Sequence, residues 1–336
     1  MMQVEVAEQT QSFLKASKQQ KSGRGLSGWG LAAAKLLLRN PGSVKKLMVL
    51  DPGEPRYVRP PREYELPTYR EGMKCCKSNE KYLRPTRWCD PCEPLVIAMA
   101  NELGAYEKTD REYAEAALDF IDNNLALELC PFNSVGVTLK RGTGSCWHLI
   151  NVFIALCRAA EIKARGKVFK QVMTEEEQNV LLSSDPLFWK IYSAVTVFSQ
   201  GEACVDGVWL DADVAASPET HAARSMPITK LGEGYIGTQR GVDPSQVWHA
   251  ESVPPFVVRG MTMLKWFAPA ARERMNVTFQ QQHALGRRII EEAGGLEAYD
   301  RKARRREELL SAEEIVEKIT RFTEEAKRKQ FLVFEK

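Results

Sequence analysis

Cys146 is the residue of this sequence with the clearest chemical role. It follows the glycine-rich stretch Gly142 to Ser145 and opens an apolar run that predicts a helix through Ala160. The first turn of a helix has unpaired backbone N–H groups, and the helix dipole adds a partial positive charge there. Both favour a thiolate, so the position predicts a nucleophile whose pKa falls below the free value of about 8.5. Position alone is equally compatible with a small buried apolar residue, which is the expectation for Cys157.

Four other cysteines form a second candidate group. Cys89 and Cys92 have the CxxC spacing, and Cys75 and Cys76 precede them in the sequence. Four thiolates could surround a zinc ion tetrahedrally, but an adjacent pair cannot easily direct both of its sulfurs to one ion. We therefore expect free thiols and no metal, with a zinc site as the alternative. Eight cysteines in 336 residues are too sparse for a disulfide scaffold, which indicates a reducing cytoplasm.

The elements that must position Cys146 follow it directly. Residues 164–172 predict a strand, and residues 191–199 and 208–214 predict two more. The stretch from Gly201 to Gly207 is expected to connect the last two strands, with an Asp-Gly turn signal at its end. A helix followed by antiparallel strands is an α+β layout.

Composition divides the chain into three regions. Residues 1–81 form an N-terminal extension with a proline-rich connector that cannot be helical. Residues 82–260 have ordinary globular sequence and form the core, and residues 261–336 are helical and highly charged. In this last region a helix around Ile319 carries a narrow apolar stripe. It is expected to dock on the domain or, alternatively, to bind a protein partner.

Charge and hydropathy exclude several classes of protein. Lysine and arginine number 47 and aspartate and glutamate 44, for a net charge of +3. This balance argues against nucleic acid or an anionic membrane as the main partner. The longest run without a charged residue, 142–157, is too short to span a membrane. No secretory signal or nucleotide-binding motif is visible, so we expect a cytoplasmic protein without a cofactor.

The segment around Cys146, GTGSCWHLINVFIALCRAAEIKARGKV, resembles the transglutaminase-like (papain-like) superfamily. The shared pattern is a glycine-rich turn, Cys-Trp, an apolar helix, an Arg-Ala-Ala motif and a strand. Upstream, YLRPTRWCDPCEPLVIAMANEL is similar to a Tyr-Leu-x-Pro-Thr segment in a bacterial branch of that superfamily. Downstream, IYSAVTVF and DGVWLDADV are similar to its two strands that carry a His and an Asp. The resemblance spans Tyr82 to Val214 and implies an α+β core in which the Cys-bearing helix packs on an antiparallel sheet.

The resemblance also implies site residues. In the family, Cys is the nucleophile, His is the base that activates it, and Asp orients the His. Carried over by position, Cys146 is the nucleophile and Asp213 the orienting residue, with Asp211 as the alternative register. The His position falls on Ser193, and a serine hydroxyl cannot take a proton from a thiol near neutral pH.

Four histidines could replace the missing base. His148 lies two residues after Cys146 on the same helix, about 200° around it, and is expected to be a structural polar residue. His221, eight residues beyond Asp213, could fold back over the cleft and is the better candidate for the base. His249 and His283 are expected at the surface or in the core.

Two classes of function follow. The first is a cysteine-dependent enzyme that cleaves a peptide, amide or thioester and passes the acyl group from Cys146 to an amine or water, with a noncanonical base. The second is a catalytically inactive relative of such enzymes that keeps the cleft as a binding or scaffold protein. The retained Cys146 and Asp213 favour the enzyme, and the missing His favours the binding protein.

Overall fold

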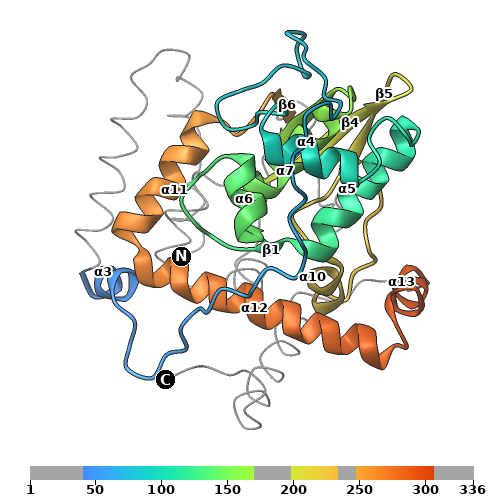
Figure 1. The fold of residues 1–336 in the computed structure, drawn as a ribbon. Helices are drawn as coiled ribbons and strands as arrows, with labels where there is room; N and C mark the ends of the chain where they lie inside the picture. Colours follow the sequence, from blue (N-terminus) through green and yellow to red (C-terminus); the bar gives the residue numbers. More distant parts are fainter. Residues whose placement is uncertain (1–40, 170–197, 234–246, 306–336) are drawn as a thin grey trace.

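The computed structural model describes residues 41–169, 198–233 and 247–305. Its centre is a four-stranded antiparallel sheet with helix α7 (Cys146–Ala159) packed against it, surrounded by further helices (Figure 1). The predicted fold class, α+β with the Cys146 helix on an antiparallel sheet, is confirmed. The other helices are α3 (Pro41–Met48), α4 (Pro94–Glu102), α5 (Asp110–Asn124), α6 (Val135–Arg141), α10 (Pro218–Ala223), α11 (Pro255–Phe267), α12 (Pro269–Glu292) and α13 (Leu296–Arg304).

The sheet has the strand order β5-β4-β3-β6, and each neighbouring pair is antiparallel. Its members are β3 (Ala164–Phe169), β4 (Phe198–Val205), β5 (Val208–Ala212) and β6 (Val247–Ala250). A separate parallel pair, β1 (Ala126–Leu127) and β2 (Thr143–Gly144), precedes the first residue of α7.

The hairpin between β4 and β5 turns at Asp206 and Gly207, as the sequence predicts. Both residues have positive φ, 51° and 79°, which is the backbone of a type I′ turn. The expected connection from Gly201 onward is wrong, because residues 201–205 belong to β4. Gly201 marks close packing here: a Cβ at this position would lie 2.8 Å from Cδ1 of Phe153 in α7.

Helix α7 is buried on all sides. Every residue from Trp147 to Ala159 is buried, which is why its sequence is apolar around the whole circumference. Two glycines let the helix approach the sheet. Like Gly201, Gly166 of β3 lies close to α7. A Cβ on Gly166 would come within 2.8 Å of the indole ring of Trp147. Helices α4, α5 and α6 pack against the rest of α7.

Arg158 is a charged residue at the end of α7 inside this core. Its guanidinium is fully buried and donates hydrogen bonds to the backbone carbonyls of Arg84, Ala164 and Glu251. These bonds join the end of α7 to three separate segments of chain.

We expect Arg158→Met to lower the free energy of unfolding by about 3 kcal/mol, because it leaves buried carbonyl oxygens without donors. Urea unfolding followed by tryptophan fluorescence measures the change. Arg111→Met is the matched control: Arg111 is exposed and, among the described residues, pairs with Glu115 within α5, so about 0.5 kcal/mol or less is expected. Equal effects of the two variants would show that the Arg158 bonds do not stabilise the fold.

The C-terminal helices lie beside the core. Helix α11 crosses residue 260, where the sequence places a domain boundary, so the division into regions 1–81, 82–260 and 261–336 stays a prediction. The expected helix around Ile319 lies outside the described residues. Helix α12 packs closely on α10, and a Cβ at Gly286 would meet the backbone of Glu219. In the described part of the chain, no helix has both the length and the apolar character needed to cross a membrane.

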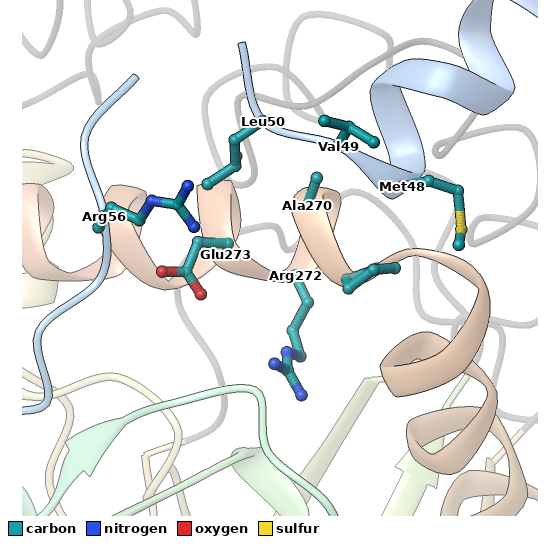
Figure 2. Close-up of a pocket in the computed structure, with 8 residues that line it drawn as sticks. Met48, Val49, Leu50, Arg56, Ala270, Arg272 and Glu273 are labelled. Atoms are coloured by element: carbon teal, nitrogen blue, oxygen red, sulfur yellow. The ribbon is translucent and has the colours of Figure 1, made fainter. Parts of the chain in front are cut away.

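A pocket of about 290 Å³ lies between the end of α3 and the start of α12 (Figure 2). None of the site residues expected from the sequence lines it. Its walls are formed by Met48, Val49, Leu50, Arg56, Pro269, Ala270, Arg272 and Glu273.

Candidate active site

Cys146 is held by the turn between α6 and α7. Gly142 ends α6 in the left-handed conformation with φ 74°, a backbone that favours glycine. Strand β2 then pairs with β1, and Ser145 is the cap before α7. Gly144 is required for space, because a Cβ there would lie 2.5 Å from Cβ of His148. The glycine-rich stretch predicted as a tight turn therefore places Cys146 at the first position of a rigid helix.

The pKa of the Cys146 thiol is raised, to about 11. The residue as a whole is partly exposed, but burial of the thiol removes water that would solvate a thiolate. The backbone N–H groups of Trp147 and Cys146 and the Ser199 hydroxyl oppose this effect, and the charge of Asp213 adds to it. The expectation of a lowered pKa is wrong, because a helix N-terminus alone does not offset desolvation.

This pKa makes a prediction for chemical labelling. Only the thiolate reacts, so the rate of alkylation of Cys146 by iodoacetamide should rise about tenfold per pH unit between pH 7 and 10. Quantitative mass spectrometry of the peptide that contains Cys146 measures the rate. The peptide with fully buried Cys157 is the internal control and should stay unlabelled in the folded protein. A plateau below pH 8 would show that the thiol is already ionised.

Ser199 lies beside the thiol. It belongs to β4, opposite Val168 of β3, and shares the face of the sheet that carries Gly201 towards α7. Its hydroxyl interacts with the Cys146 thiol and favours the thiolate, although it makes no well-aligned hydrogen bond within the described structure. Ser193, the residue expected in this position from the sequence, lies outside the described residues.

Asp213 is close enough to the thiol for its charge to raise the thiol pKa. It follows β5 and is 2% exposed, and its Oδ1 accepts a hydrogen bond of 3.3 Å from the backbone N–H of Ala215. Its Oδ2 has no hydrogen-bond partner in the described structure. Burial raises the pKa of Asp213 to about 6. The alternative register, Asp211, is placed elsewhere: it forms an ion pair with Lys167, at 2.9 Å.

His221 lies beside the Asp213 carboxylate, and its recorded contacts in the described structure are with groups other than the Cys146 thiol. On α10, its Nδ1–H donates to the Ser217 carbonyl at 3.2 Å, and its Nε2 lies 3.2 Å from the Thr229 hydroxyl. Nε2 is 3.7 Å from Oδ2 of Asp213. Burial lowers the pKa of His221 to about 4, so the ring is neutral at pH 7 and this contact is not an ion pair.

All four histidines are among the described residues. The three other than His221 contact groups other than the Cys146 thiol. His148 contacts the Ser145 hydroxyl at 2.7 Å and stacks on Phe132, so it is structural, as the sequence suggests. The rings of His249 and His283 face the carboxylates of Glu202 and Glu219, at 3.3 and 3.4 Å respectively.

The second group of cysteines does not converge on one point. Cys89 is fully buried and directs its thiol to the Asn151 carbonyl at 3.5 Å, while the thiols of Cys75 and Cys92 lie 3.8 Å apart. Cys76 is also buried. The described residues contain no group of three or more cysteine, histidine or carboxylate side chains arranged to hold a metal ion. The arrangement gives no support to the zinc alternative.

Residues 97–214 match the model of the transglutaminase-like superfamily. The chain is similar to this superfamily over about a third of its length. The matched range includes Cys146, Ser199 and Asp213, and His221 lies beyond its end. This domain fold supports cysteine-dependent catalysis in general.

A solved structure gives a second comparison, with a candidate cysteine protease from Cytophaga hutchinsonii. The two chains share 23% identity over 40% of each chain, with a TM-score of 0.30. The chain therefore spans well under half the length of that protein. The search of curated proteins found no match.

Proposed function

We propose that the transglutaminase-like domain catalyses cysteine-dependent acyl transfer. The observation that carries this proposal is the thiol of Cys146 at the first position of α7, with backbone N–H groups directed at it and the buried carboxylate of Asp213 close enough to raise its pKa. The sulfur attacks the carbonyl carbon of the acyl donor, and the amine or thiol of the donor leaves. Water or an amine then cleaves the Cys146 thioester and releases the acyl group.

Asp213 is the proposed base. Its Oδ2 has no hydrogen-bond partner in the described structure, and its pKa of about 6 leaves it ionised at neutral pH. Moving the proton from a thiol of pKa about 11 to this carboxylate costs about 7 kcal/mol. A turnover of about 10 s⁻¹ corresponds to a barrier of about 16 kcal/mol, so this cost fits within a slow enzyme's barrier.

The high pKa of the Cys146 thiol determines which acyl donors it can attack. At pH 7 a thiol of pKa about 11 is ionised to only about one part in ten thousand. Such a nucleophile favours a donor with a good leaving group, and we infer that thioesters are better substrates than peptides or simple amides. The acyl acceptor is water or an amine.

A matched pair of substrates tests the proposal. The purified protein is given a thioester and an amide of the same acyl group, and intact-mass spectrometry follows the Cys146 acyl adduct. We expect an adduct with the thioester, slow release of product, and loss of both in Cys146→Ala. A Cys146→Ala protein that releases product at the wild-type rate would refute the nucleophile.

A second function is favoured by one specific observation. Ser199 lies against the thiol, and the recorded partners of all four histidines are groups other than Cys146. This arrangement suits a binding protein that keeps the cleft without turnover. Equal affinity of wild type and Cys146→Ser for an acylated peptide, with no adduct in either, would support this function over catalysis.

A further inference from the structure

Two thiols that the proposed reaction does not use lie close together at the other end of α7. Sγ of Cys75 and Sγ of Cys92 are 3.8 Å apart, although the residues are 17 positions apart in the sequence. Both residues are partly exposed, whereas Cys76 and Cys89 beside them are buried. Each thiol of the pair has only weak partners: Cys75 contacts the Pro91 carbonyl at 3.4 Å, and Cys92 the Cys76 carbonyl at 3.7 Å.

The residues between these thiols, 76–91, form a loop over the C-terminal half of α7. The loop begins with the Cys76 N–H bonded to the carbonyl of Ala159, the last residue of α7. Further along, the Tyr82 carbonyl accepts from the N–H of Ala164, the first residue of β3. The side chain of Arg84 then binds both carboxylate oxygens of Glu251, at 3.0 and 2.6 Å. The loop therefore joins the helix, the sheet and the segment before α11.

We propose that Cys75 and Cys92 are a reversible redox pair whose disulfide closes the 76–91 loop into a covalent ring. A disulfide bond is about 2.05 Å long, so the sulfurs must approach by about 1.8 Å. Rotation of two partly exposed side chains can supply a movement of this size.

The reaction is a two-electron exchange with a small disulfide such as oxidised glutathione. One thiolate of the pair attacks the glutathione disulfide and releases one glutathione; the second thiol displaces the other glutathione. The two protein S–H bonds and the glutathione S–S bond break, one protein S–S bond and two glutathione S–H bonds form, and the two electrons and two protons are carried away on two glutathione molecules. Burial raises the pKa of Cys75 to about 12, so the exchange should be slow at pH 7 and faster at pH 9.

The test uses the full chain. The reduced protein is incubated at pH 9 with oxidised glutathione, remaining thiols are blocked, and non-reducing peptide mass spectrometry identifies the links. We expect a loss of two titratable thiols of the eight and one linked peptide that joins Cys75 to Cys92. Dithiothreitol should restore both thiols and remove the linked peptide. Cys75→Ser should abolish the link, and Cys204→Ser, which changes a partly exposed cysteine elsewhere, should leave it intact.

A second measurement reports on the ring itself. Trypsin should cut the oxidised protein more slowly than the reduced protein within the loop, at Lys77, Lys81 and Arg87, and this protection should be missing in Cys75→Ser. A link between Cys76 and Cys92, mixed disulfides with glutathione alone, or no change in either measurement would overturn the proposal.

Discussion

Ser199→His should raise the rate at which iodoacetamide alkylates Cys146 by about a hundredfold at pH 7. An imidazolium placed on β4 beside the thiol would form the ion pair that the wild-type protein lacks, and would bring the thiol pKa from about 11 to about 7. The thiolate population then grows about ten-thousandfold, but a thiolate of lower pKa is a weaker nucleophile, with a Brønsted coefficient of about 0.45. The product of the two effects is the expected hundredfold gain.

Measurement of alkylation rate against pH decides this prediction. The rate of the Ser199→His protein should level off near pH 7, while that of the wild type should keep rising towards pH 11. Ser193→His is the matched control, since it places the same ring at the position expected from the sequence. A gain in Ser193→His without one in Ser199→His would show that the neighbour of the thiol is misassigned.

Asp213→Asn should lower kcat/KM for a thioester substrate by about 10²- to 10⁴-fold, because it removes the proposed general base. The same change should slightly increase the alkylation of Cys146, since the negative charge of Asp213 raises the pKa of the thiol. A misfolded variant would also lose turnover and expose the thiol, so the peptide with fully buried Cys157 serves as the control for the fold. Labelling of Cys146 without labelling of Cys157 separates a lost base from a damaged fold.

Two further variants complete this experiment. Asp211→Asn is the matched control, because Asp211 pairs with Lys167 and should leave both rates unchanged within a factor of about three. His221→Ala tests the relocated base suggested by the sequence. Its ring is neutral and bonded to Ser217 and Thr229, so we expect little effect on turnover beyond any loss of stability. Loss of turnover in His221→Ala, with Asp213→Asn still active, would reverse the assignment.

The sequence contains enough local information to predict α7 and the turn before it. A glycine-rich stretch, a cap and a long apolar run are features of neighbouring residues, and the structure has all three. The second half of β4 was harder to predict, because Gly201 signals a turn locally but is required by Phe153, nearly 50 residues earlier in the chain. Ser199 lies in the expected strand but is not singled out as a site residue, because the resemblance places the histidine position on Ser193.

The electrostatics of the site depend still more on tertiary structure. The position of Cys146 at a helix start predicts a low pKa, and the backbone N–H groups do act in that direction. Burial of the thiol outweighs them, and burial depends on elements that are distant in sequence. For the same reason the close pair Cys75 and Cys92 could not be separated from Cys76 and Cys89 by spacing alone.

The two glycines under α7 have a consequence for how this site can change by mutation. Gly166 and Gly201 fix the gap between the helix that carries the nucleophile and the sheet that leads to Asp213. One added methyl group at either position would push α7 outward and lengthen the path of the proton from sulfur to carboxylate. Reactivity can therefore be tuned from positions that carry no functional group, and inactive relatives can arise while Cys146 and Asp213 are both retained.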